Sequence, residues 1–116
     1  IYWDKEDIQT VTRIIKRGSY WAAGPEIQEF EKKLSKYFNT KYVVTFNSGT
    51  SALHAVLLAY EITSGEVIVP SMSFISTANA VFLAGAKPIF AEIEEKTIGL
   101  DPEDVRKKCS NKILYN

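Results

Sequence analysis

Asn47-Ser-Gly-Thr-Ser-Ala-Leu-His-Ala-Val-Leu-Leu-Ala-Tyr-Glu61 decides the fold, because four small or polar residues stand directly before an almost wholly apolar helical run. The run Tyr42–Phe46 just before it is rich in β-branched and aromatic residues, which predicts a strand. Residues 51–60 are apolar nearly all round, and such a helix is normally buried. The stretch therefore predicts a strand, a tight polar turn and a buried helix.

The same order of strand and helix continues on both sides of this stretch. Strands are predicted at residues 42–46, 66–69, 88–93 and 112–115. Helices are predicted at residues 4–17, 25–38, 51–60, 73–83 and 101–108, with Ile8, Val11, Ile15, Ile27, Phe30, Leu34 and Phe38 on inward faces. Alternating strands and helices indicate an α/β open sheet that is at least partly parallel, and we expect a single partial domain over residues 1–116.

Composition excludes several classes of protein. The 116 residues are 46% hydrophobic and 24% charged, as in a globular domain. The formal net charge is zero, which gives no reason to expect nucleic acid as a partner. No apolar run approaches the roughly 20 residues of a membrane span. The single Cys109 and the lack of a secretory signal favour a cytoplasmic setting, and no metal-ligating cluster is predicted.

The turn at residues 47–50 has the features of an anion site. Ligands of open α/β sheets bind beyond the carboxyl ends of the strands, where this turn lies. Gly49 lets the backbone approach a bound group, free N–H groups start the helix, and Ser48 and Thr50 add hydroxyl donors. A phosphate fits this set, although the spacing is that of neither a Walker loop nor a dinucleotide-binding turn. A simple helix cap remains the alternative interpretation.

A second strand-to-helix turn, residues 70–77, lies on the same edge of the predicted sheet. Phe74 stands near the start of the following helix, where its ring can stack on a flat ligand held by the first turn. The alternative is that Phe74 packs into the core or staples the helix end.

Six stretches of this chain resemble the DegT/DnrJ-type sugar aminotransferases, in the order and near the spacing of that family. They are Gly24-Pro-Glu-Ile-Gln-Glu-Phe-Glu31, Asn47-Ser-Gly-Thr-Ser-Ala-Leu53, Glu66-Val-Ile-Val-Pro70, Ser73-Phe-Ile-Ser-Thr-Ala-Asn-Ala80, Gly85-Ala-Lys-Pro-Ile-Phe90, and Thr97 with Leu100-Asp101-Pro102. The resemblance covers the chain from about Gly18 onward and concerns the amino-terminal part of the family.

This resemblance implies a three-layer open sheet, part of the aspartate-aminotransferase-like (fold type I) large domain. It implies pyridoxal 5'-phosphate (PLP) as cofactor, with Ser48, Gly49 and Thr50 at its phosphate and Phe74 against its ring. A homodimer is implied, together with a keto-sugar nucleotide as substrate and an amino acid as amino donor.

The chain departs from the family in what it lacks. The family's Schiff-base lysine and the aspartate that pairs with the cofactor ring come later in family members, and Lys87 and Lys112 do not take that place. We therefore expect an amino-terminal fragment with no catalytic residue of its own, inactive alone. Two alternatives stay open: a PLP-dependent sugar dehydratase on the same scaffold, with histidine in place of that lysine, and a truncated non-catalytic protein.

Overall fold

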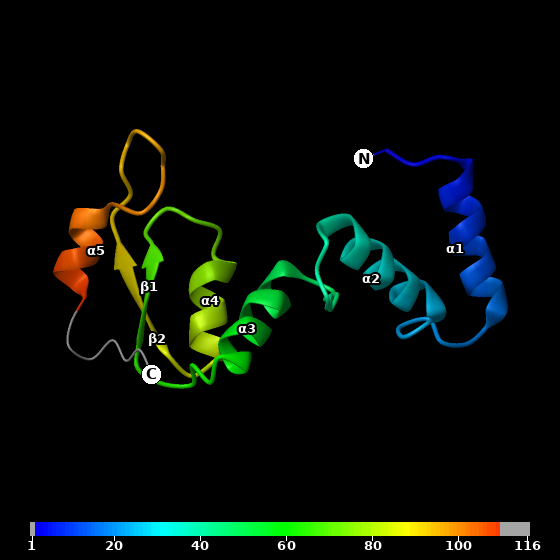
Figure 1. The fold of residues 1–116 in the computed structure, drawn as a ribbon, viewed down its shortest axis with the longest axis horizontal. Coiled ribbons are helices and arrows are strands. Elements are labelled where there is room, and N and C mark those ends of the chain that lie inside the picture. The colour runs from blue at the N-terminus through cyan, green and yellow to red at the C-terminus, as the bar shows by residue number, and fades with distance from the viewer. Residues whose placement is uncertain (1, 110–116) are drawn as a thin grey trace. The chain divides into compact units, whose positions relative to one another are not determined.

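The computed structural model describes residues 2–109 of the chain (Figure 1). Its internal contacts divide the chain into two units, residues 1–45 and residues 46–116, where the sequence predicts a single partial domain. The first unit is helical. The second unit holds a parallel pair of strands with helices packed against it.

The first unit contains α1 (Lys5–Arg17) and α2 (Pro25–Phe38), both within the limits that the sequence predicts. The carboxylate of Asp4 accepts hydrogen bonds from the amides of Glu6 and Asp7, at 2.8 and 3.2 Å. The Asp7 carboxylate accepts the Asp4 N–H in return, at 3.0 Å, so the two residues form a capping box. Gly18, with φ of 73°, ends α1 in the left-handed conformation that glycine adopts without strain.

Arg17 fixes the loop between the two helices. Its guanidinium donates to the carbonyls of Ser19 and Tyr20, both at 3.0 Å, and to the carboxylate of Glu26 in α2, at 2.8 Å. The hydrogen bond that Arg17 donates to Glu26 holds the pKa of this carboxyl below its usual value. A Cβ atom at Gly24 would lie 2.7 Å from the Tyr20 carbonyl oxygen, so a larger residue here would have to displace the loop backbone.

The strand predicted at residues 42–46 is wrong for this structure, which has no strand there. A strand needs a neighbour for its backbone hydrogen bonds, and this segment has side chains instead. The Thr45 N–H donates to the carboxylate of Glu31 at 2.9 Å, and the Thr40 hydroxyl donates to the Tyr42 carbonyl at 2.7 Å. Hydrogen bonds with the side chains of Glu31 in α2 and of Thr40 therefore replace some of those that a partner strand would make.

The apolar faces of α1 and α2 are not buried in their unit, contrary to the prediction. Ile8, Val11 and Ile15 are each at least half exposed, and Phe30 and Phe38 are 54% and 64% exposed. The two helices do not pack along each other, since their firm link is the Arg17 ion pair at the connecting loop. The described residues of this unit leave these apolar side chains largely uncovered.

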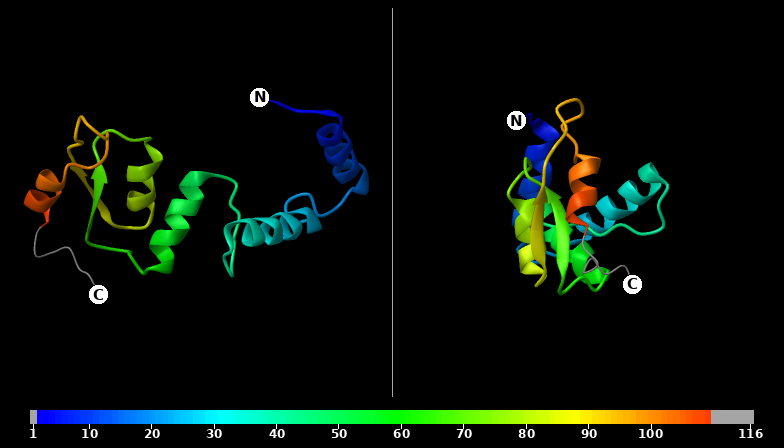
Figure 2. Two further views of the ribbon diagram at one scale, coloured as in Figure 1. Left: turned by 45° about the horizontal axis from the view of Figure 1, so that its top comes forward. Right: turned by 90° about the vertical axis from the view of Figure 1, so that its left-hand side faces the viewer.

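The second unit is built around β1 (Glu66–Pro70) and β2 (Lys87–Ala91), which run parallel with Ile68 opposite Ile89. Helix α4 (Ser76–Leu83) connects the strands and packs against both. Helix α5 (Pro102–Lys108) contacts β2, and the strands lie between α4 and α5 in Figure 1. Figure 2 shows the two strands side by side from a second direction. The unit is thus a mixed α/β fragment with a two-stranded parallel sheet.

The core of this unit is small. Val69 of β1, Val81 of α4 and Ala86 before β2 are buried, and Leu57, Ile62 and Val67 pack against them. Helix α3 (Gly49–Ala59) packs against α4 but contains no buried residue, so the predicted burial of this helix is wrong here. The apolar side chains of this helix could be buried, but within the described residues its contacts with α4 and the small core leave much of its surface exposed.

Several element boundaries differ from the prediction. The helix expected from Ser73 begins at Ser76, and the strand expected to reach Ile93 ends at Ala91. Ile93 instead forms an isolated antiparallel bridge with Leu100. The short helix after Asp101 is confirmed, and the strand predicted at residues 112–115 lies outside the described residues.

Candidate functional site

The turn at residues 47–50 starts α3, as predicted, and Ser48 is the residue that caps this helix. Its Oγ accepts the N–H of Ser51 at 3.1 Å, and its carbonyl accepts the N–H of Ala52 at 3.1 Å. The helix-cap interpretation of the turn is therefore confirmed for Ser48. It leaves the roles of the neighbouring residues undecided.

The hydroxyl proton of Ser48 is already used in a short chain of hydrogen bonds that includes Ser51 and Asn47. The Ser51 hydroxyl donates to Oδ1 of Asn47 at 3.1 Å and lies 2.9 Å from Oγ of Ser48. A hydroxyl carries one proton, so Ser48 must be the donor in the bond between the two serines. Ser48 can donate to a ligand only by releasing Ser51, a residue that the sequence analysis does not single out.

Gly49 and Thr50 are the residues of the turn that remain available. Among the hydrogen bonds of residues 2–109, none uses the N–H of Gly49, the N–H of Thr50 or the Thr50 hydroxyl. A Cβ atom at Gly49 would meet nothing within 4 Å, and its φ lies outside the left-handed region. The described fold therefore gives no reason for glycine here, whereas a ligand close to the backbone would give one.

The donors of the turn suit a small anion. Backbone N–H groups at the start of an 11-residue helix carry the positive end of its dipole, and a hydroxyl stands beside them. No Asp or Glu lies within residues 47–60, so nothing in the turn or in α3 repels negative charge. A phosphate group of a cofactor fits these donors.

Phe74 lies in the segment between β1 and α4, and its side chain is 77% exposed. It is therefore not a core residue of this unit, while a staple at the start of α4 stays the alternative to stacking. In Figure 1 α3 and α4 both start at the upper end, where β1 and β2 finish, and the two helices pack together. The turns before them thus belong to one end of the unit, and stacking of Phe74 on a ligand stays a prediction.

The start of α4 differs chemically from that of α3. Ile75 precedes α4 without any side-chain cap, and the Ser73 hydroxyl pairs with the Thr77 hydroxyl at 2.9 Å. Lys87 lies at the opposite end of β2 from Phe74 and pairs with Glu66 at 3.3 Å. Lys87 is thus paired with an acid away from the candidate site.

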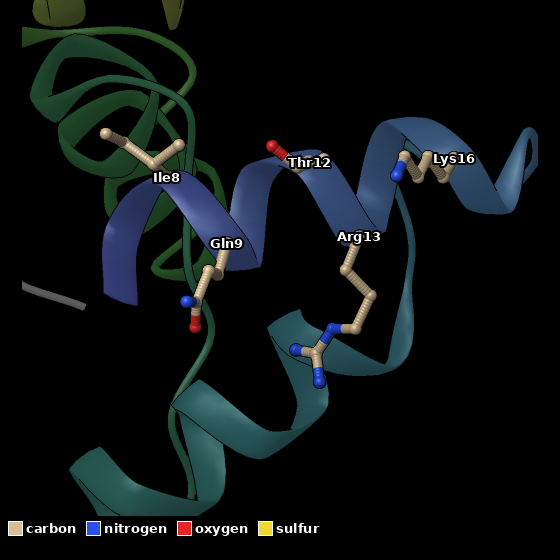
Figure 3. Close-up of a pocket in the computed structure, with 5 residues that line it drawn as sticks. All are labelled: Ile8, Gln9, Thr12, Arg13 and Lys16. Carbon is tan, nitrogen blue, oxygen red and sulfur yellow. The ribbon is translucent and has the colours of Figure 1, made fainter. Parts of the chain in front are cut away.

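Two shallow grooves among the described residues lie in the first unit, away from the predicted residues. One is lined by α1 alone, and Figure 3 shows its side chains, with Arg13 reaching toward α2. The other lies where Arg13 and Arg17 face Glu26 and Glu29. The first groove is lined on one side only. In the second groove, the carboxylates of Glu26 and Glu29 balance the charges of Arg13 and Arg17. The turn at residues 47–50, whose donors at Gly49 and Thr50 have no partner within the described part of the chain, is the better candidate site.

Among residues 2–109, no three His, Cys, Asp or Glu side chains gather in a way that could hold a metal ion. No helix within these residues has the length and apolar character needed to cross a bilayer.

Comparison with known proteins places the chain among sugar aminotransferases. The profile of the DegT/DnrJ/EryC1/StrS aminotransferase family matches residues 2–113. The chain is 42% identical, over 84% of its length, to the spore coat polysaccharide biosynthesis protein SpsC of Bacillus subtilis, and covers 25% of that protein. It is 40% identical over 86% of its length to the 3-oxo-glucose-6-phosphate:glutamate aminotransferase of the same organism, and covers 23% of it.

Solved structures agree with this result. The crystal structure of NtdA from Bacillus subtilis with bound cofactor PMP superposes with a TM-score of 0.81 at 36% identity, over 90% of this chain and 24% of that one. The chain thus spans about a quarter of the length of its relatives. The matches in sequence and in structure cover the same stretch, and the chain belongs to the DegT/DnrJ/EryC1/StrS aminotransferase family.

Proposed function

We propose that the polypeptide containing this chain is a PLP-dependent aminotransferase that moves an amino group from an amino acid to a keto-sugar nucleotide. Relatives support the substrate class: one is a UDP-2-acetamido-2-deoxy-3-oxo-D-glucuronate aminotransferase and another is a GDP-perosamine synthase. Another relative, Spr1654 from Streptococcus pneumoniae, has been solved in both a PLP and a PMP form. The structural observation that carries the proposal is that the donors at Gly49 and Thr50 have no hydrogen-bond partner among residues 2–109.

The residues of this chain have a binding role in the proposed enzyme. The N–H groups of Gly49 and Thr50 and the Thr50 hydroxyl hold the cofactor phosphate, and Ser48 keeps the helix start in place. Phe74 lies against the face of the cofactor ring. When bound, PLP supplies the electron sink that allows an amino group to pass between an amino acid and a carbonyl compound.

The proposed enzyme has the three-layer open sheet of the aspartate-aminotransferase-like large domain and acts as a homodimer in the cytoplasm. Exposed apolar side chains support association: Leu53, Val56 and Leu58 of α3 are each 44–53% exposed. Surfaces of this kind are usually covered by other parts of a protein or by a partner. Among the described residues of the second unit, α4 makes the main contact with this helix.

Cofactor affinity tests the proposal, measured in the polypeptide that the complete open reading frame encodes. Thr50→Ala removes one hydroxyl donor to a charged phosphate, which is worth about 1.5–3 kcal/mol, or about ten- to a hundred-fold in the dissociation constant of PLP. Ser64→Ala is the matched control, because this exposed hydroxyl precedes β1 at the opposite end of the strand. A Thr50→Ala protein with lower stability without cofactor but unchanged affinity would mean that the turn only caps the helix.

Activity provides the second arm of the test. The encoded polypeptide, supplied with PLP and glutamate, is expected to aminate a keto-sugar nucleotide, while residues 1–116 alone are expected to transfer no amino group. Dehydration of the sugar without amino transfer would reject the aminotransferase. Amino transfer by residues 1–116, together with a single pyridoxyl-lysine after borohydride reduction, would reject the binding-only role of this chain.

A further inference from the structure

The two edges of β2 have different surroundings. The Lys87 N–H donates to the Gly65 carbonyl at 2.9 Å, and the Ala91 carbonyl accepts the Ser71 N–H at 2.8 Å. The backbone N–H and C=O groups of residues 87, 89 and 91 therefore point toward β1. Backbone groups alternate along a strand, so those of residues 88, 90 and 92 point to the outer edge. An outer edge of this kind is a ready template for a strand of another chain.

Side chains of α5 occupy this outer edge. The Glu92 N–H donates to Oδ2 of Asp104 at 2.7 Å, and Nζ of Lys108 donates to the Phe90 carbonyl at 2.7 Å. The same Nζ and Oδ2 atoms lie 2.7 Å apart as an ion pair. The Glu92 carbonyl is also taken, because it accepts the Asp101 N–H at 2.8 Å. A donor and two acceptors of the outer edge thus already have partners within the unit.

A proline in β2 also hinders strand pairing at this outer edge. Pro88 stands at an outward position of β2 and has no N–H, so it cannot donate to a neighbouring strand. An added parallel strand needs evenly spaced donors and acceptors along the edge. Pro88 removes a donor near the start of β2, and Asp104 with Lys108 takes up the groups at its end.

The ion pair of Asp104 with Lys108 is less exposed than the other ion pair of α5. The side chains of Asp104 and Lys108 are 16% and 34% exposed, whereas those of Glu103 and Arg106, which pair on the same helix, are 70% and 71% exposed. The first pair faces β2 and the second faces solvent. Ordinary helix stabilisation by paired charges needs no backbone contact, so the contacts to Phe90 and Glu92 require another explanation.

We propose that Asp104 and Lys108 form an edge cap, which keeps the outer edge of β2 from pairing with a strand of a second copy of this chain. The cap is independent of cofactor binding and of the proposed reaction. Its removal frees the Glu92 N–H and the Phe90 carbonyl, which gives a strand of a second copy one donor and one acceptor near the end of β2.

Hydrogen exchange followed by mass spectrometry tests the cap in the polypeptide encoded by the complete open reading frame. Asp104→Ala is expected to speed exchange of the peptide containing Glu92 by about ten-fold. Asp104→Asn keeps an acceptor oxygen and is expected to retain most of the protection. Glu103→Ala, one residue away on α5, is the matched control and is expected to leave this peptide unchanged.

Sedimentation supplies the second readout. The Asp104→Ala/Lys108→Met double variant is expected to form larger assemblies as its concentration rises, while a Glu103→Ala/Arg106→Met control keeps the wild-type distribution. Equal effects in the two double variants would overturn the edge cap, as would wild-type exchange at Glu92 in Asp104→Ala. If Asp104→Ala does not fold, Lys108→Met alone carries the test, since it keeps the side-chain stem, and a wild-type distribution for it would overturn the cap.

Discussion

Gly85 and Gly65 form a matched pair that separates backbone strain from steric contact. Both have positive φ angles, 93° at Gly85 and 80° at Gly65. A Cβ atom at Gly65 would meet nothing within 4 Å, whereas one at Gly85 would lie 2.7 Å from the Thr63 carbonyl oxygen. Alanine at Gly65 therefore introduces strain alone, and alanine at Gly85 introduces strain and a clash with the backbone.

The expected size of each effect follows from these distances. A side chain in the left-handed region costs about 1–2 kcal/mol, which is the full effect expected for Gly65→Ala. At Gly85 the contact must also open by about 0.7 Å to reach 3.4 Å, where ordinary contact begins. Overpacking of this kind costs about 1–3 kcal/mol, so Gly85→Ala is expected to destabilise by about 2–5 kcal/mol in total.

Urea unfolding of the encoded polypeptide and of both variants measures these values, from the midpoint and the slope of the transition. The larger loss at Gly85 is expected with an unchanged slope, since the unfolded chain exposes the same surface. Equal losses at Gly85 and Gly65 would refute the steric argument. A stabilised Gly65→Ala would refute the argument from backbone strain.

Two more outcomes concern the core and the edge of β2. Val81→Ala is expected to lower the free energy of unfolding by about 1.5–3 kcal/mol, because Val81 is buried and the loss of two methyl groups creates a cavity. A decrease of less than about 0.5 kcal/mol in urea unfolding would contradict the place of Val81 in the core. Hydrogen bonds from Lys108 and from the backbone N–H of Glu92 lower the pKa of Asp104, so its charge stabilises the fold above about pH 5, and this contribution is lost as the pH falls through the lowered pKa. The stability difference between the protein and Asp104→Asn is therefore expected to be constant from about pH 5 to 7 and to shrink below about pH 4; a difference that grows on acidification would contradict it.

Sequence alone predicts those parts of the fold that depend on local chemistry. Asp4 and Gly18 mark the ends of α1, and Asp101 with Pro102 marks the start of α5, because caps act within a few residues. The segment 42–46 is different. Its residues favour a strand, but a strand forms only beside another strand, and the choice of neighbour is not a local property.

At the candidate site, too, the sequence predicts local features but not the hydrogen bonds that depend on the folded backbone. The sequence identifies the turn and its small and hydroxyl residues, and the family assignment of the chain is confirmed. It does not separate Ser48, whose oxygen caps α3, from Thr50, whose hydroxyl is free of such bonds in the described structure. That division follows from the positions of the Ser51 and Asn47 side chains, which only the folded backbone provides.

PLP affinity of Gly49→Ala, measured together with stability in the absence of cofactor, tests the central claim most directly. The described fold leaves room for a methyl group at Gly49 and imposes no positive φ, so alanine is expected to leave stability unchanged or to raise it by up to about 1 kcal/mol. A phosphate held against the backbone at this position leaves no such room, so the dissociation constant of PLP is expected to rise about ten-fold or more. Unchanged PLP affinity in a Gly49→Ala protein of normal stability would contradict the assignment of this turn to the cofactor phosphate.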